Sequence, residues 1–211
     1  MKYLGKPAGM WALFAGSFEK HLTVEFDLTA GQAKDVAARA KKKYREIIAK
    51  LPEFDKRDRF EMNIVNCAML AAFILCMPQR PDIKTLTDYY AAAMMTPTMK
   101  AFCRASGKKK FTPKDIEGMK ATAKLRAGDR NPYSWNMDFY EYPDGSGYEA
   151  RFSRCGICTL MQELGLYDLT PAMCHLDYAM SEADGVTNFV RQYTLVSGGP
   201  YCDCGYQKKR V

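Results

Sequence analysis

The sequence predicts an α+β fold in which an N-terminal helical layer packs on a small antiparallel sheet, with two short helices between the hairpins of the sheet. Apolar residues recur every three or four positions up to about residue 126, which is the spacing of amphipathic helices. After Gly128 they alternate with polar residues, as in strands buried on one face. With 211 residues, 47% of them apolar, we expect a single domain over 1–211, mainly helical over 1–127 and carrying the candidate site over 128–211.

The first two expected helices are separated by a proline. Residues 31–51 place apolar side chains on one face and lysines and arginines on the other, and Pro52 follows. Asp58 has the side chain of a helix cap and predicts a second helix that runs to about residue 77. Because this second segment is largely apolar, we expect it to be buried.

Proline also organises the next two helices. A helical stretch over 83–102 contains Pro97, which lacks a backbone donor and should break or kink the helix. Thr112 followed by Pro113 combines a capping side chain with a first-turn proline, and predicts a fourth helix to about residue 126.

The second half is expected to contain four strands and two helices. Apolar and polar residues alternate on either side of the turn at 143–147, which predicts a β-hairpin. Gly165 marks a helix end, and Thr170 with Pro171 marks a helix start. In order, we expect strands 135–139 and 148–152, helices 155–164 and 170–180, and strands 189–195 and 202–206.

Composition narrows the functional classes. The net charge of +7 is concentrated in three short basic runs, Lys41–Lys43, Lys108–Lys110 and Lys208–Arg210, which we expect to be solvated surface. No nucleic-acid-binding motif accompanies them, and no apolar stretch approaches the roughly 20 residues that span a bilayer. Without a recognisable secretory signal, we expect a cytoplasmic protein that binds a small-molecule substrate, with no nucleic-acid or membrane partner. A homo-oligomer is left open.

Five of the eight cysteines fall in the last fifty-seven residues. They are Cys155, Cys158, Cys174, Cys202 and Cys204. In a reducing compartment such residues are metal ligands, catalytic thiols or buried apolar groups. The other three, Cys67, Cys76 and Cys103, lie in apolar helical segments and are expected only to pack.

The spacing of these cysteines permits two kinds of site. Cys155 and Cys158 lie at the start of a predicted helix, where free N–H groups should favour a thiolate, and so a nucleophile or a ligand. Cys202 and Cys204 are two apart on a predicted strand, so both sulfurs face one side and could complete a four-thiolate zinc site. Asp203 would face away. The alternative is that the first pair only packs the helix on the sheet.

A second set of polar residues follows the first cysteine pair. Cys174 and Asp177 are three apart and share one side of a predicted helix. His175 points about 100° away from Cys174, so we expect it at the surface or supporting a ligand group rather than as a ligand. Arg191 shares a predicted strand face with apolar residues, which would bury its charge. Its partner is then either an internal carboxylate, such as Asp177, or the carboxylate of a small substrate.

These residues carry a resemblance to a known family. The chain resembles the L-2-amino-thiazoline-4-carboxylic acid hydrolases over most of its last sixty residues, and more loosely through Tyr44–Ile48, Leu51-Pro52 and Asp58-Arg59. The resembling segments are Cys155-Gly-Ile-Cys158, Leu164-Gly165-Leu166, Pro171-Ala-Met-Cys174-His-Leu-Asp177, Arg191-Gln-Tyr-Thr194-Leu195 with Gly198-Gly199, and Cys202-Asp-Cys204.

The resemblance implies hydrolysis of a cyclic isothiourea. Water would add to the ring carbon between nitrogen and sulfur, and the ring would open to a carbamoylated cysteine. Cys155 would then be a nucleophile, Cys174 a second thiol or ligand, Asp177 the general base or acid, and Arg191 the holder of the ring carboxylate. His175 and Thr194 are further candidates for substrate binding.

The identity of the nucleophile stays open at this stage. It is either a cysteine thiolate or water activated by a divalent metal such as zinc or manganese. The metal ligands would come from Cys155, Cys158, Cys174, Cys202 and Cys204. A different class of function is also open, a non-catalytic module that holds a metal or a small ligand at the cysteine cluster. Thiol–disulfide chemistry at Cys155 and Cys158 ranks last, because the strand-first βαβ context of such motifs is absent.

Overall fold

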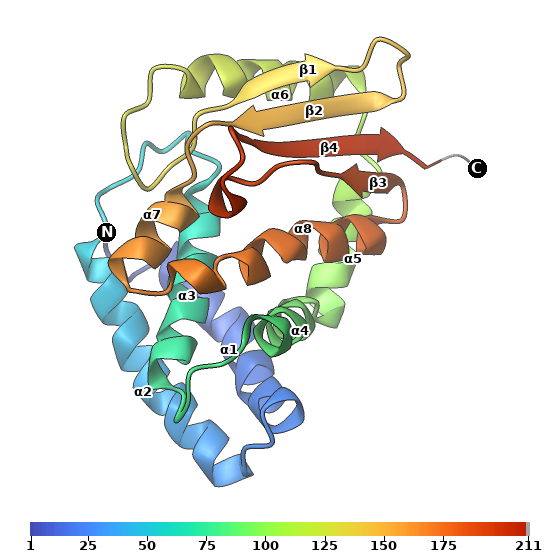
Figure 1. Cartoon of the computed structure of the whole chain (residues 1–211). Coiled ribbons are helices and arrows are strands. Elements are labelled where there is room, and N and C mark those ends of the chain that lie inside the picture. The colour runs from blue at the N-terminus through green and yellow to red at the C-terminus, as the bar shows by residue number, and fades with distance from the viewer. Residues whose placement is uncertain (210–211) are drawn as a thin grey trace.

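The computed structural model describes residues 1–209, and these form an α+β structure (Figure 1). The helices are α1 Lys6–Glu25, α2 Ala30–Lys50, α3 Glu61–Cys76, α4 Ile83–Met94, α5 Pro97–Gly107, α6 Pro113–Arg126, α7 Gly156–Glu163 and α8 Pro171–Asp184. The strands are β1 Asp138–Glu141, β2 Gly147–Phe152, β3 Thr187–Val190 and β4 Cys202–Lys208. They form one antiparallel sheet in the order β1-β2-β4-β3. The predicted fold class is confirmed.

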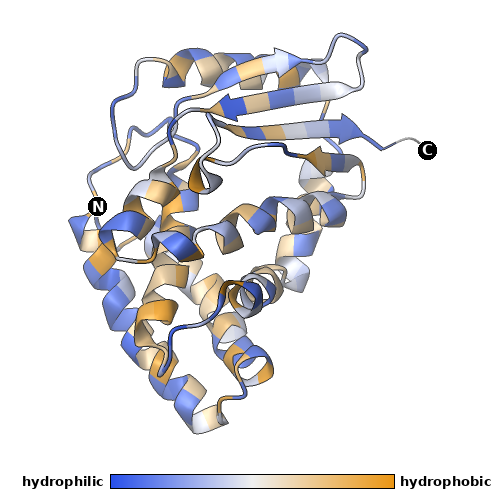
Figure 2. Cartoon of the chain, in the orientation of Figure 1, coloured by the Kyte–Doolittle hydropathy of each residue, from blue (hydrophilic) through white to orange (hydrophobic). Residues whose placement is uncertain are grey.

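Helix α3 is the centre of the helical layer. Eleven of its sixteen residues are buried, and it contacts both α2 and α7. Trp11 of α1 stacks between Tyr44 of α2 and Phe73 of α3, with ring centroids 5.4 and 5.6 Å away. The Tyr44 hydroxyl donates to the Pro7 carbonyl at 3.0 Å, which satisfies its buried polar atom. Figure 2 shows hydrophobic residues along α3, as its role in the core requires.

Two of the predicted helix starts are confirmed in atomic detail. The Thr112 hydroxyl accepts a hydrogen bond from the Asp115 N–H, and α6 begins at Pro113. Thr96 caps α5 in the same way through the Met99 N–H, so Pro97 begins a new helix rather than kinking a continuous one. Helix α5 then continues five residues past the predicted end, to Gly107.

The prediction for Asp58 is wrong. Helix α3 begins at Glu61, and Asp58 accepts instead from the Phe60 N–H in the turn before it. Its other oxygen lies 2.5 Å from the Ser134 hydroxyl and 3.2 Å from the guanidinium of Arg126. Both charged side chains are 1% exposed. Asp58 therefore joins the start of α3 to the end of α6 through a buried ion pair, which its sequence context did not indicate.

Strands β1 and β3 are shorter than predicted, whereas β2 and β4 extend beyond their predicted bounds. Strand β1 begins at Asp138, so the buried Trp135 precedes it. Strand β3 ends at Val190, opposite Gly205 of β4, so Arg191 lies in the loop after the strand and not on it. Helix α8, by contrast, extends to Asp184 and ends at Gly185, whose φ of 76° suits a glycine.

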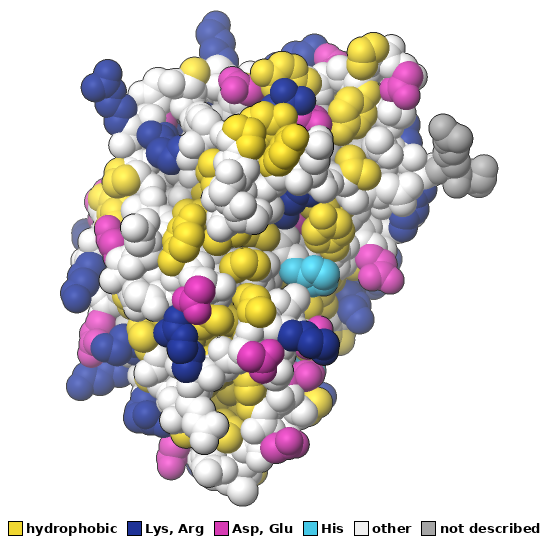
Figure 3. Space-filling model, in the orientation of Figure 1, with side chains coloured by type: hydrophobic (Ala, Val, Ile, Leu, Met, Phe, Trp, Pro, Cys, Tyr) yellow, Lys and Arg dark blue, Asp and Glu magenta, His cyan; other side chains and the backbone are white. Residues whose placement is uncertain are grey.

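The surface carries dispersed charge. Figure 3 shows lysine and arginine side chains scattered among acidic and hydrophobic ones on the face in view. Lys108 and Lys109 are exposed as expected, but Lys110 is only partly exposed. The last predicted basic run ends at Arg210, which lies outside the described residues. Among helices in residues 1–209, none has the length and apolarity that crossing a membrane requires.

Candidate functional site

Arg191 is the centre of a buried hydrogen-bond network between α8 and β4. Its side chain is 7% exposed and lies over the Phe189 ring. Nε donates to the Asp203 carbonyl at 3.0 Å, and Nη1 donates to the Cys174 carbonyl at 2.9 Å. Nη2 donates to Asp177 Oδ2 at 2.6 Å and to Cys204 Sγ at 2.9 Å. The geometry therefore favours the internal-partner alternative for Arg191.

Asp177 is held by this network and still reaches solvent. Its side chain is 38% exposed, and Oδ2 is the oxygen that pairs with Arg191. No described residue donates a hydrogen bond to Oδ1. A buried guanidinium thus orients the carboxylate while one oxygen stays available to another molecule.

Asp203 positions the loop that carries Arg191. Its side chain points away from the two flanking cysteines, as expected, and its oxygens accept from the N–H groups of Gln192 and Tyr193 at 2.6 Å each. These two bonds hold the backbone after Arg191 in a loop beside β4, where the Tyr193 carbonyl also accepts from the Asp203 N–H at 3.4 Å. The residue is 7% exposed, so both oxygens find their donors within the chain.

Cys155 is the residue that precedes the first turn of α7. Its thiol hydrogen-bonds to Cys158, and that bond and burial raise the pKa of Cys155 well above its ordinary value. The N–H groups of residues 157 and 158 oppose the shift but do not outweigh it. The shift is therefore opposite to the lowering expected from the helix N-terminus.

The thiols of the C-terminal segment lie close enough to influence one another. Burial raises the pKa of Cys174 to about 12, with Arg191 opposing and Cys155 and Cys202 adding to the rise. Burial also raises the pKa of Cys202, although its sulfur accepts from the Leu195 N–H at 3.1 Å. All five cysteines of this segment are free thiols. Within residues 1–209, no three His, Cys, Asp or Glu side chains form a group suited to hold a metal ion, so the arrangement gives the metal-site alternative no support.

The two remaining predicted binding residues lie at the edge of this region. His175 is exposed and stacks on Tyr178, with ring centroids 5.6 Å apart. The Thr194 hydroxyl accepts from the Ser197 N–H at 3.2 Å and stabilises its own loop. Neither side chain contacts Asp177 or Arg191 by a hydrogen bond in the described structure.

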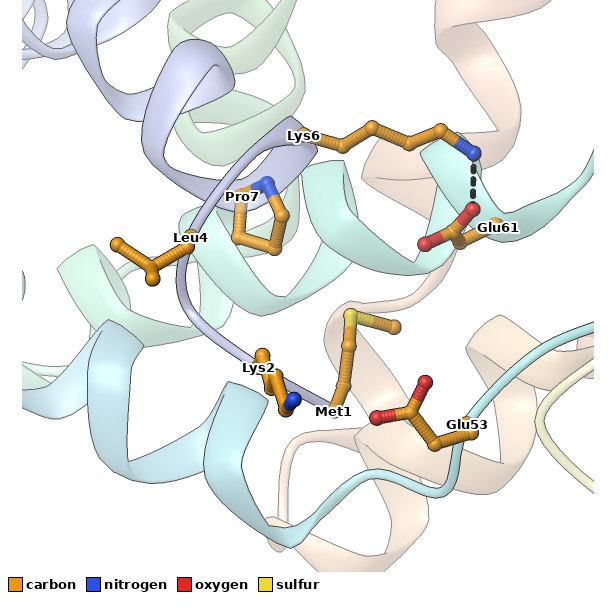
Figure 4. A pocket seen from close by; sticks show the side chains of 7 residues that line it. All are labelled: Met1, Lys2, Leu4, Lys6, Pro7, Glu53 and Glu61. Carbon is orange, nitrogen blue, oxygen red and sulfur yellow. Dashed lines mark hydrogen bonds and ion pairs between the residues drawn. The ribbon is translucent and has the colours of Figure 1, made fainter. Parts of the chain in front are cut away.

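A small cavity of about 70 Å³ adjoins Asp177. Residues of α5, α8 and β4 form its wall, together with Lys110 from the turn after α5. A larger hollow of about 380 Å³ lies elsewhere, between the N-terminus and the loops before α3 (Figure 4). The Lys6–Glu61 ion pair crosses that hollow, and it contains no residue of the predicted site.

Comparison with known protein families shows to which family the chain belongs. The family model described as L-2-amino-thiazoline-4-carboxylic acid hydrolase matches residues 62–206, about two thirds of the sequence. The chain belongs to this hydrolase family. No curated protein and no solved structure matches it. The resemblance predicted from the C-terminal motifs is confirmed.

The segment matched to the L-2-amino-thiazoline-4-carboxylic acid hydrolase family contains the whole candidate site. It runs from α3 to Tyr206 and so includes the Arg191 network, the five thiols and the cavity beside Asp177. Helices α1 and α2, which contribute Trp11 and Tyr44 to the core, precede the match. The residues that match the family model therefore include the whole polar network around Arg191.

Sequence reasoning missed three polar groups of the site in this hydrolase family member. Asp203 was expected only to face away, although it fixes the Arg191 loop. Tyr167 follows α7, and its hydroxyl contacts the Cys158 sulfur. Lys110 was assigned to a solvated basic run. The sequence signal for Lys110 was its place at the end of the run, directly before the apolar Phe111.

Proposed function

We propose that this chain opens a small carboxylated cyclic amidine or isothiourea, such as 2-amino-thiazoline-4-carboxylate, to a carbamoylated cysteine. A C–O bond forms between water and the ring carbon that lies between nitrogen and sulfur. The proton that water gives up passes to the nitrogen of the C=N bond. One ring bond of that carbon then breaks as the new hydroxyl becomes a carbonyl, and the proton of that hydroxyl passes to the departing ring atom. The family match supports the reaction class, and the substrate is the proposed part.

Asp177 carries the proposal. It is the general base that takes the proton from water, because its Oδ1 is free of hydrogen bonds from the described residues and it lines a cavity. Arg191 acts through Asp177: it holds Oδ2 at 2.6 Å and so aims the other oxygen. Four of the five guanidinium N–H groups are engaged by the chain, so Arg191 is a positioning residue rather than a carboxylate clamp.

Water is the nucleophile that the thiol environment favours. Because the pKa of Cys174 is raised to about 12 and that of Cys155 well above its ordinary value, both side chains hold their protons near neutral pH. A thiol that is protonated is a weak nucleophile. Cys174 lies one helical turn before Asp177, and neither Cys174 nor Cys155 lines the cavity beside Asp177.

The test is turnover of 2-amino-thiazoline-4-carboxylate, followed by mass spectrometry of the carbamoylated product. In Asp177→Asn, kcat should fall about 10²–10⁴-fold, the usual contribution of a general base, while far-UV circular dichroism stays unchanged. Glu182→Gln is the matched control, because it removes the same charge from an exposed position of the same helix. Full activity in Asp177→Asn would refute the role of Asp177. Wild-type binding of the thiazoline without turnover would instead favour the binding-module alternative.

A further inference from the structure

Lys110 occupies an unusual position for a residue of a basic run. It follows α5 and its side chain is 21% exposed. Its ammonium lies 3.3 Å from the centre of the Tyr206 ring and lines the cavity that also contains Asp177. Burial lowers the pKa of Lys110, and the nearby Asp184 opposes that shift. A cation that is largely withdrawn from solvent normally has a hydrogen-bonded anion beside it.

The nearest carboxylate to Lys110, that of Asp184, already accepts hydrogen bonds from other groups of the chain. Asp184 Oδ1 accepts from the N–H groups of Val186 and Thr187 at 2.8 and 2.9 Å, and Oδ2 accepts from the Thr187 hydroxyl at 2.7 Å. The ammonium of Lys110 remains 3.8 Å from Oδ2, beyond hydrogen-bond distance. Within residues 1–209, no acceptor takes a hydrogen bond from Lys110 Nζ. Its N–H groups are therefore available to an acceptor that enters the cavity.

We propose that Lys110 and the adjoining cavity form a subsite that binds the carboxylate of a small substrate. The ammonium supplies charge-assisted hydrogen bonds, and Arg191 leaves this role open because the chain itself engages four of its five N–H groups. The negative charge of Asp177 is balanced by Arg191, and the carboxylate of Asp184 accepts hydrogen bonds from three donors of the chain. An incoming carboxylate therefore meets a cation with unused donors.

The dimensions of the cavity fit a carboxylate on a small ring. A volume of about 70 Å³ takes the carboxylate group, while the ring stays toward the mouth. Phe102 lines the cavity and is 59% exposed, so it lies at the rim and offers an apolar surface to the ring. Asp177 lies in the wall of the same cavity. A substrate anchored at Lys110 would thus present its ring near the proposed base.

The inference deepens the proposed function, since it assigns the group that recognises the substrate carboxylate. It can be tested without turnover, because acetate alone is a sufficient probe of the subsite. We expect acetate to shift the methyl signal of ¹³C-labelled Met180, which lines the cavity, in the wild-type protein. Acetamide at the same concentration and chloride at the same ionic strength should leave it unmoved. A Met180 signal that acetate does not move would overturn the subsite.

Substitutions supply the second measurement. Lys110→Met keeps an unbranched side chain, one atom shorter and without the charge, and should weaken acetate binding, and raise KM for the carboxylated thiazoline, about tenfold or more. Its KM for the decarboxylated ring should not change. Lys109→Met is the matched control, because its side chain is exposed in the same run. Unchanged acetate affinity in Lys110→Met would overturn the inference, and the wild-type Met180 signal decides the matter if this variant fails to fold.

The two proposals can fail separately. Turnover by the wild type together with an unaltered KM in Lys110→Met would refute the subsite and leave the ring-opening function intact. Acetate binding that depends on Lys110, without turnover of the thiazoline, would refute the ring opening and support a carboxylate-binding site.

Discussion

At the scale of single residues, the positioning role of Arg191 follows from how many of its N–H groups already donate hydrogen bonds within the chain. Lysine in its place presents a point charge and cannot reach Asp203, Cys174 and Asp177 from one planar group. Arg191→Lys should therefore lower the free energy of unfolding by about 1–3 kcal/mol, since a buried acceptor loses its donor. Urea denaturation measures this change.

Kinetics of the same variant distinguish positioning from substrate binding. We expect kcat to fall equally on carboxylated and decarboxylated rings, because Arg191 acts through Asp177. A KM increase restricted to the carboxylated ring would contradict this and would restore Arg191 as the carboxylate clamp. Arg80→Lys is the control, because Arg80 forms an exposed ion pair with Asp168, and such pairs contribute little.

The sequence could predict which residues form the site better than it could predict their protonation and hydrogen bonding. That Asp177 is a candidate partner of Arg191 followed from the need of a buried guanidinium for an anion, which left a substrate carboxylate as the alternative. The protonation of Cys155 did not, because it depends on the Cys158 thiol and on burial, which a helix position alone cannot reveal. Lys110 was missed for a related reason: a lysine run looks solvated until the fold shows which side chain turns inward.

At the scale of elements, two glycines that lie in helices should respond in opposite ways to substitution by alanine. A Cβ on Gly156, at the start of α7, would lie 2.0 Å from the Tyr133 carbonyl oxygen, whereas a Cβ on Gly118 in α6 meets nothing within 4 Å. Gly156→Ala should move α7 and lower the melting temperature. Gly118→Ala should raise the free energy of unfolding by about 0.5–1 kcal/mol, because alanine is the better helix former.

Thermal melts of the two variants check this prediction, and a tolerated Gly156→Ala would contradict the close approach of α7 to the preceding loop. Gly118→Ala should keep wild-type kinetics, since α6 contributes no residue to the proposed catalytic network.

Element boundaries were predictable where a local signal determines them and not where a distant group does. Thr112 with Pro113 began a helix as expected, since capping involves only neighbouring residues. The strand predicted over 189–195 ended at Val190 because the Asp203 carboxylate takes the amides of Gln192 and Tyr193. Asp203, which competes with the sheet for these amides, lies eleven positions from Gln192 in sequence. The hydrophobic periodicity of the predicted strand therefore gives no sign of this competition.

At the scale of the whole molecule, buried thiols make stability depend on pH. Seven cysteines have a folded-state pKa above the ordinary value of about 8.5: Cys67, Cys76, Cys103, Cys155, Cys174, Cys202 and Cys204. Above that pH the unfolded chain releases these protons and the folded chain retains them. The free energy of unfolding should therefore be fully present below about pH 8.5 and fall as the pH rises.

Urea unfolding at several pH values between about 7 and 10 measures this dependence. The lowered pKa of Lys110 makes the free energy of unfolding rise with pH. This is one group, whereas the seven cysteines make the free energy of unfolding fall with pH. Cys67→Ala removes a fully buried thiol and should reduce the slope. A free energy of unfolding that rises over this range would contradict the account.

The α+β class was predictable because apolar residues recur with the period of a helix in the first part of the chain and with the period of a strand in the second. The order β1-β2-β4-β3 was not, because pairing β4 between β2 and β3 depends on contacts between segments far apart in sequence. The expectation of a single domain concerns cooperativity, which neither periodicity nor strand order measures.

The stacked position of Trp11 has a spectroscopic consequence. The two tryptophans of the chain are both buried, Trp11 between aromatic rings of the helical layer and Trp135 against Phe60, which in turn packs on Phe152 of the sheet. Each is a built-in fluorophore for a different half of the molecule. Trp11→Phe and Trp135→Phe leave one emitter each, and coincident emission shifts in urea would show that the halves melt as one cooperative unit. Separate midpoints would identify the helical layer and the sheet as independently folding bodies.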